Sequence, residues 1–188
     1  MNKRTSGRGR AGGRTARGPA RRPREKAMRT AVHRLIELLT EVFEEESWQA
    51  PLTASLEGLT ASQATWKPER ATNSIWMIVN HLSLWKEYQV ARLAGEAPRP
   101  SGWAEKLDWL EIRDTGEPTW QAAVERLRMA QKQLVIGLAT RTDADLARPL
   151  PGGKSPLYKI YSMAPHDAYH CGQIRLLRAL HGVPAKPF

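Results

Sequence analysis

Apolar residues recur at three- and four-residue intervals over long stretches of the chain, which is the spacing of an amphipathic helix. Four stretches show this pattern, and they cover approximately residues 28–47, 73–95, 118–140 and 157–180. Asn73 and Ser74 are good N-cap residues for the second stretch, and Pro118 suits the first turn of the third. The pattern therefore predicts four long helices.

Shorter helical signals lie in the connections between these stretches. Thr60 with Gln63, and Thr142 with Asp145, have the spacing of a capping box, and the leucines before Thr60 predict a further short helix. The segment 97–117 is rich in Pro and Gly, which predicts an excursion with a short helix inside it. No alternating strand pattern or internal repeat is present. We therefore expect an all-α fold, a four-helix bundle with short extra helices in its connections.

Composition supports a helical domain of ordinary size. The 188 residues include 24 Ala and 20 Leu but only 7 Val and 7 Ile, which disfavours a β-sandwich or barrel. No apolar run approaches the roughly 18 residues that a spanning helix needs, and the N-terminus lacks the apolar segment of a secretory signal. The sequence predicts a soluble, cytoplasmic protein without a membrane partner.

The net charge of +10 is concentrated at the N-terminus. Residues 1–26 hold ten of the 29 Lys and Arg side chains and one of the 19 acidic ones, so the rest of the chain is almost neutral. This Arg/Gly-rich segment has no apolar residue larger than Ala after Met1, which predicts a disordered tail over 1–27 and a folded domain over 28–188. A basic tail can contact nucleic acid weakly, but without aromatic residues a solvated appendage is favoured.

Histidines are the candidate metal ligands, because the single cysteine, Cys171, cannot supply a Cys-rich site. His166 and His170, in the string HDAYH, stand one turn apart on the last long helix and share a face with Gln173, which directs both rings inward. Two separately satisfied core histidines would also fit this spacing. His81 is directed inward from the second long helix, and it could complete a three-histidine site with an open position.

Other assignments of these residues fail. HDAYH resembles the HExxH helix of zinc peptidases, but Asp167 is shorter than the Glu that serves as general base there, and no third ligand follows. The Glu-x-x-His spacing of di-iron proteins is absent, and so is a Gly-rich phosphate loop after a strand. Cys171 points away from the proposed ligands, while Pro165 is expected to kink or restart the helix. His33 and His181 are expected to be ordinary surface or edge histidines.

Two segments together resemble the DinB/YfiT-like family of metalloenzymes. These are SIWMIVNHLSLWKEYQVARLAGE, residues 74–96, and HDAYHCGQIRLLRALHG, residues 166–182, and the run SLEGLTASQATWKPE at 55–69 fits as well. The resemblance covers the chain from about Met28 and excludes the basic tail. It implies an up-down-down-up four-helix bundle, a homodimer in many members, and a divalent metal held by His81, His166 and His170.

The resemblance further implies chemistry of thiol transfer onto electrophiles, for which the metal would be Zn, Ni, Mn or Fe. A three-histidine metal lowers the pKa of a bound water or thiol, so the substrate would be a small molecule such as a low-molecular-weight thiol. Gln173 is a candidate to support a ligand or contact the substrate, and Trp85 and Tyr88 are expected to line or pack beside the site. Two hypotheses result: a metal-dependent transferase or hydrolase, or a non-catalytic, metal-stabilised or stress-related protein whose tail contacts nucleic acid.

Overall fold

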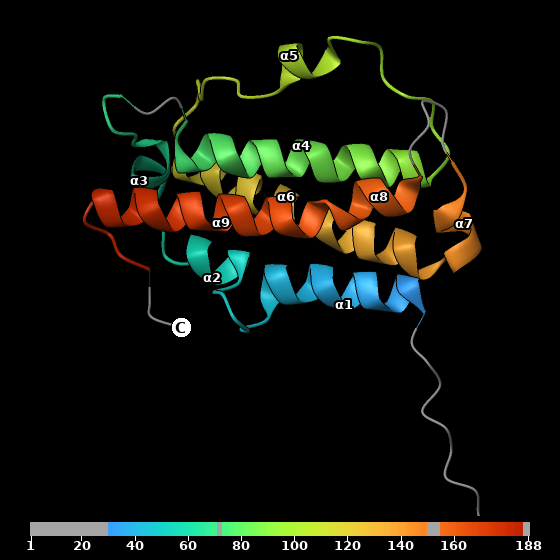
Figure 1. The fold of residues 1–188 in the computed structure, drawn as a ribbon. Coiled ribbons are helices and arrows are strands. Elements are labelled where there is room, and N and C mark those ends of the chain that lie inside the picture. The colour runs from blue at the N-terminus through green and yellow to red at the C-terminus, as the bar shows by residue number, and fades with distance from the viewer. Residues whose placement is uncertain (1–29, 71–72, 150–154, 186–188) are drawn as a thin grey trace, which may run out of the picture.

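The computed structural model describes residues 30–70, 73–149 and 155–185, and these residues form helices and no strand (Figure 1). Four helices are long: α1 (Ala31–Glu44), α4 (Ile75–Leu93), α6 (Glu117–Ala139) and α9 (Met163–Leu180). Five short helices lie in the connections: α2 (Leu52–Leu56), α3 (Ala61–Thr65), α5 (Trp103–Leu107), α7 (Asp143–Ala147) and α8 (Pro156–Tyr161). The all-α prediction is confirmed, including both capping boxes, which begin α3 and α7.

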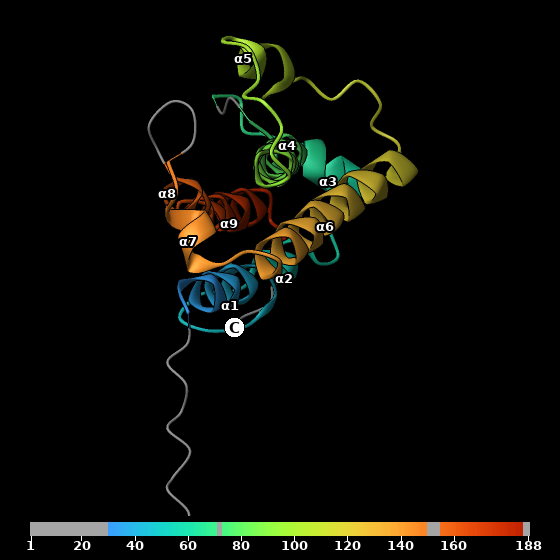
Figure 2. The same ribbon diagram turned by 90° about the vertical axis from the view of Figure 1, so that its right-hand side faces the viewer.

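The long helices pack side by side in a closed order. Helix α6 packs most extensively against α4 and also against α1, while α9 packs against α1, α2 and α4. Viewed along the helices, α5 stands outside this body beyond α4, on the excursion predicted over 97–117 (Figure 2). Among the helices that the structure describes, none is both long enough and apolar enough to span a membrane.

The core consists of two apolar clusters with a polar layer between them. Leu82, Leu127 and Ile174 belong to the cluster near α2 and α3, and residues further along α4 and α6, such as Leu93 and Leu134, belong to the other. Between these clusters α4 contributes Lys86, α6 contributes Gln131 and α9 contributes Asp167, none more than 1% exposed. A buried polar layer is stable only if its members are paired.

Lys86 supplies that pairing. Its ammonium donates to Asp167 Oδ2 at 2.5 Å and to Gln131 Oε1 at 2.9 Å, and Gln131 Nε2 donates to the Leu39 carbonyl at 3.0 Å. Burial raises the pKa of Asp167, an effect that the charge of Lys86 opposes. One network therefore links α4 to α9, α6 and α1.

Two predicted helix boundaries differ from the structure. Helix α1 ends at Glu44 rather than near Ser47, because the consecutive carboxylates Glu44, Glu45 and Glu46 interact unfavourably with the negative end of a helix. The part of α1 predicted to begin at Met28 lies outside the described residues, as do the tail over 1–27 and most of the loop near Gly152.

The predicted last long helix is two helices, and the break lies three residues before Pro165. Helix α8 ends at Tyr161, and α9 begins at Met163 after Ser162, whose N–H bonds back to the Tyr158 carbonyl. Pro165 has no N–H to donate to the Tyr161 carbonyl, so an uninterrupted helix would lose that bond. The restart before Pro165 places the proline in the first turn of α9, where it is tolerated.

Replacing Lys86 by Met should destabilise the protein by about 3–5 kcal/mol, because Asp167 would be left buried without its charge partner. The double variant Lys86→Met, Asp167→Leu should lose less than the single variant, since it removes both charges from the polar layer. Urea unfolding followed by circular dichroism would measure both. A double variant less stable than Lys86→Met would contradict this account of the layer.

Asp143 is predicted to hold the beginning of α1 in a pH-dependent way. Its carboxylate accepts from the Ala31 and Val32 N–H groups, both at 3.0 Å, and these bonds lower its pKa below the usual 3.8. A depressed pKa contributes stability above pH 4 that is lost as the pH falls through the folded-state value. Asp143→Asn should therefore lower the melting temperature at pH 7 and weaken its dependence on pH below 4. Glu69→Gln, at an exposed site outside the caps, should leave both unchanged.

Candidate metal centre

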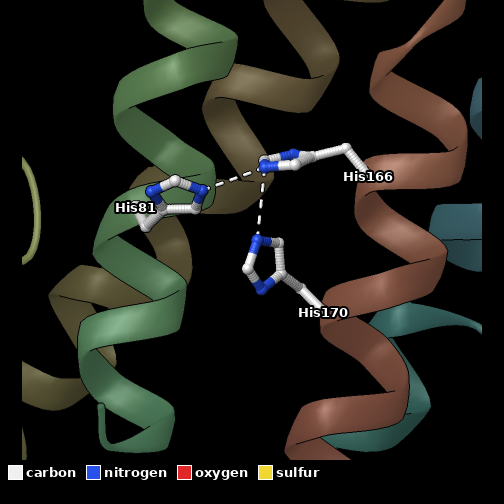
Figure 3. A group of neighbouring side chains, drawn as sticks. All are labelled: His81, His166 and His170. Carbon is white, nitrogen blue, oxygen red and sulfur yellow. Dashed lines mark hydrogen bonds between the residues drawn. The ribbon is translucent and has the colours of Figure 1, made fainter. Parts of the chain in front are cut away.

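Three histidine side chains from two helices meet between α4 and α9 (Figure 3). His81 Nε2 lies 2.9 Å from His166 Nε2, which lies 3.2 Å from His170 Nε2. The three potential ligand atoms are all within 4.8 Å of one another. The structure thus brings together the three residues that the sequence analysis singled out.

Helical geometry accounts for this convergence. His166 and His170 are one turn apart on α9, so their side chains project from the same side of that helix. His81 occupies the facing side of α4, a helix whose first turn is capped by the Ser74 hydroxyl. The rings are shielded by their surroundings, and His81 and His170 are only 7% and 4% exposed.

Hydrogen bonds at the opposite ring nitrogens orient two of the histidines. His81 Nδ1 lies 2.8 and 2.9 Å from the two carboxylate oxygens of Asp108, and His170 Nδ1 lies 2.7 Å from Gln173 Oε1. Both partners accept, so the proton of each neutral ring belongs on Nδ1. His81 and His170 therefore direct unprotonated Nε2 atoms toward His166.

The third histidine, His166, differs from the other two in the surroundings of its Nδ1 atom. Its Nδ1 is buried and has no hydrogen-bond partner among the described residues, and its Nε2 faces two other Nε2 atoms. One proton on His166 Nε2 cannot be donated well to two acceptors in different directions. Three converging ring nitrogens with lone pairs are suitable ligands for a divalent cation, so the residues present fit a metal ion.

The electrostatic setting keeps the three rings neutral. Burial, with repulsion from His170, lowers the pKa of His166 to about 4. Burial also lowers the pKa of His170 to about 4, against the effect of its hydrogen bond to Gln173. The pKa of His81 is lowered by burial too, although Asp108 opposes that shift. Neutral imidazole is the form that binds a metal, so the rings need no deprotonation at neutral pH.

Asp108 and Trp109 are the two site residues that the sequence analysis missed. Trp109 stacks on His81 with ring centroids 4.0 Å apart, and Asp108 also accepts from Trp85 Nε1 at 2.9 Å. Both follow α5, in a segment without periodic pattern that brings them back to α4 only in the tertiary structure. The one signal in the sequence is an acidic residue between two large apolar ones, Leu107 and Trp109.

The remaining predicted residues divide into those at the site and those away from it. Gln173 supports His170, and Trp85 lies edge-on to His81 with centroids 6.3 Å apart. Tyr88 packs edge-on against Trp85, with ring centroids 6.0 Å apart. The other two histidines lie elsewhere, since His33 pairs with the Thr30 hydroxyl and His181 stacks on Trp66.

Two further side chains on α9 face away from the three histidines. Cys171 is buried, with its sulfur 3.1 Å from the Ser55 hydroxyl and 3.3 Å from the Ala50 carbonyl. Asp167 is turned into the core toward Lys86, where it is inaccessible to water. An acid in that position cannot act as the general base of a zinc peptidase, which agrees with the exclusion drawn from HDAYH.

Comparison with known proteins gives one positive result. The family model of the DinB superfamily matches residues 45–174, a range that contains all three histidines, Asp108 and Gln173. No curated protein and no solved structure matches the chain. Because the family model covers more than half of the sequence, the chain belongs to the DinB superfamily.

Proposed function

We propose that this protein binds one divalent metal ion through His81, His166 and His170. The convergence of three Nε2 atoms, two of them left unprotonated by Asp108 and Gln173, carries the proposal. Imidazole ligands suit Zn, Ni and Fe, and Mn belongs to the same set of candidates. Within the described residues the ligand cluster contains no Cys, Asp or Glu, so the protein offers three ligands.

We further propose that the metal serves an enzyme acting on a small molecule, by thiol transfer or hydrolysis. Three protein ligands leave a position for water or substrate, and a bound divalent metal would lower the pKa of a water or of a low-molecular-weight thiol. Asp108 and Gln173 hold two of the three imidazoles, those of His81 and His170, in the tautomer that metal binding requires. Trp109 covers one face of the His81 ring and keeps water from it.

A second candidate function is non-catalytic, and the placement of the ligands favours it. His81 comes from α4 and the other two ligands from α9, so a bound metal would tie two long helices together. A metal that binds only the folded state stabilises that state. The contact with nucleic acid that this hypothesis assigns to residues 1–27 stays a prediction, because those residues lie outside the described part of the chain.

Three finer features belong to the same proposal. An up-down-down-up bundle is supported by the colour gradients of Figure 1, in which α1 and α9 progress in one direction and α4 and α6 in the other. A homodimer is supported by exposed apolar side chains on α9: Tyr169, Leu176 and Leu180 are 63%, 59% and 59% exposed. A cytoplasmic location is in keeping with the free thiol of Cys171.

Metal content tests the first part of the proposal. The purified full-length chain should carry or take up about one equivalent of Zn or Ni by elemental mass spectrometry, as a single three-histidine site requires. His81→Ala, His166→Ala and His170→Ala should each lose it, and His33→Ala should retain it because His33 lies outside the cluster. Parent protein that takes up no metal would contradict the proposal.

Chelation distinguishes the two functions. If the metal is catalytic, treatment with EDTA should leave the circular dichroism spectrum helical and lower the melting temperature, because the buried core persists without metal. Consumption of a thiol in the presence of an electrophile should then stop, and it should return with added metal. A purely structural metal predicts that chelation unfolds the protein. A folded, metal-loaded protein without turnover over a panel of thiols and esters would favour the non-catalytic function.

A further inference from the structure

The connection between α4 and α6 carries a segment, residues 97–112, that we call the strap. Helix α5 within it has no buried residue, and no residue between 94 and 116 is buried. Helix α5 also lacks any extensive packing against another helix. The strap therefore adds no fully buried residue to the apolar core, although its partly buried Trp109 and Ile112 pack against one of the two clusters.

Apart from an ion pair between Glu111 and Lys67 at 3.2 Å and the packing of Ile112, the contacts of the strap gather around the candidate metal centre. Trp103 packs on Trp85 and Tyr88 of α4, with ring centroids 5.3 and 5.0 Å apart. At the other end of the strap Trp109 stacks on His81. Both attachment points lie on the face of α4 that presents the first of the three histidines.

Asp108 is the centre of this attachment. Its carboxylate accepts three different donors: His81 Nδ1, Trp85 Nε1 at 2.9 Å and the Trp109 backbone N–H at 3.0 Å. The next residue, Trp109, has a φ of 56°, a left-handed conformation that is unfavourable for a bulky side chain. Such a conformation persists only where its surroundings enforce it, and here the stack on His81 and the bonds of Asp108 do so.

We propose that Asp108 is a positioning residue that couples metal binding to docking of the strap. The proposal rests on the proposed metal site. A metal on His81 Nε2 would withdraw electron density from the ring and strengthen the Nδ1–H bond to the carboxylate. The docked strap in turn fixes the orientation and tautomer of His81. Coupling of this kind is reciprocal, so metal protects the strap and the docked strap tightens metal binding.

The test uses the full-length chain with Zn²⁺ as the ligand. Zn²⁺ affinity is measured by competition with a chelating dye, and hydrogen exchange of peptides covering 97–112 is measured with and without Zn²⁺. The variants are Asp108→Asn, which keeps one acceptor oxygen, Asp108→Ala, and Trp103→Ala, which loosens the strap without touching a histidine. Asp114→Asn is the matched control, because within the described part of the chain that carboxylate accepts from Gly116 and Thr119 and from no group at the metal centre.

In the parent, Zn²⁺ should slow exchange over 97–112. Asp108→Ala should weaken Zn²⁺ binding about 10–100-fold, as expected for loss of a carboxylate behind a ligating histidine, and Asp108→Asn should weaken it less. Trp103→Ala should weaken it about fivefold or more, since coupling between sites has typically at least that size. All three should lose the protection by metal, and Asp114→Asn should behave as the parent. Visible spectra of the Co²⁺ forms would verify that each variant still offers the histidines.

Parental Zn²⁺ affinity in Asp108→Asn and Trp103→Ala, or exchange over 97–112 that ignores Zn²⁺, would overturn the coupling while leaving the metal site intact. Should Asp108→Ala fail to fold, the other two variants decide the question alone. A parent that binds no Zn²⁺ would overturn the coupling together with the proposed function. A parent that binds Zn²⁺ and loses it in His81→Ala keeps the proposed metal site, so that failure of the other variants to respond would then count against the coupling alone.

Discussion

The buried ion pair between Lys86 and Asp167 determines how α4 and α9 face each other. Neither side chain is exposed, and each would be costly to bury without the other, so the two helices cannot slide by a turn without separating the charges. Lys86 stands little more than one turn beyond His81, and Asp167 lies between His166 and His170 in the chain. The register that pairs the charges is therefore the register that brings three imidazoles together.

Placement of this polar layer between two apolar clusters has consequences for the histidines. The clusters supply the hydrophobic burial that holds the four long helices, and the layer between them tolerates groups that must be hydrogen-bonded. Imidazoles at such a position are desolvated, which explains why the pKa values of His166 and His170 fall to about 4. The fold thus keeps its candidate ligands neutral chiefly by burial, and repulsion between the neighbouring rings adds to the effect.

The hydrogen bonds that orient His170 and His81 come from different parts of the chain, one from the same helix and one from a distant segment. Gln173 reaches His170 from one turn away on the same helix, so α9 orients that ring by itself. Asp108 reaches His81 from a segment 27 residues further along the chain, and its bond depends on the strap being docked. One ligand is consequently held by rigid helix geometry and another by a connection that has no buried residue of its own.

Much of this protein could be predicted from the sequence. Helical periodicity, two capping boxes and the i, i+4 spacing of His166 and His170 are local properties, so the four long helices and the inward direction of the candidate ligands were predictable. A restart near Pro165 was also predictable, because proline has no N–H to donate. Its place at Ser162 was not, since apolar periodicity continues across that residue. The pairing of Asp167 with Lys86, and the return of Asp108 and Trp109 to His81, were decided by the tertiary structure. Those contacts join residues far apart in the chain, and no periodic pattern records which distant groups will share a buried position.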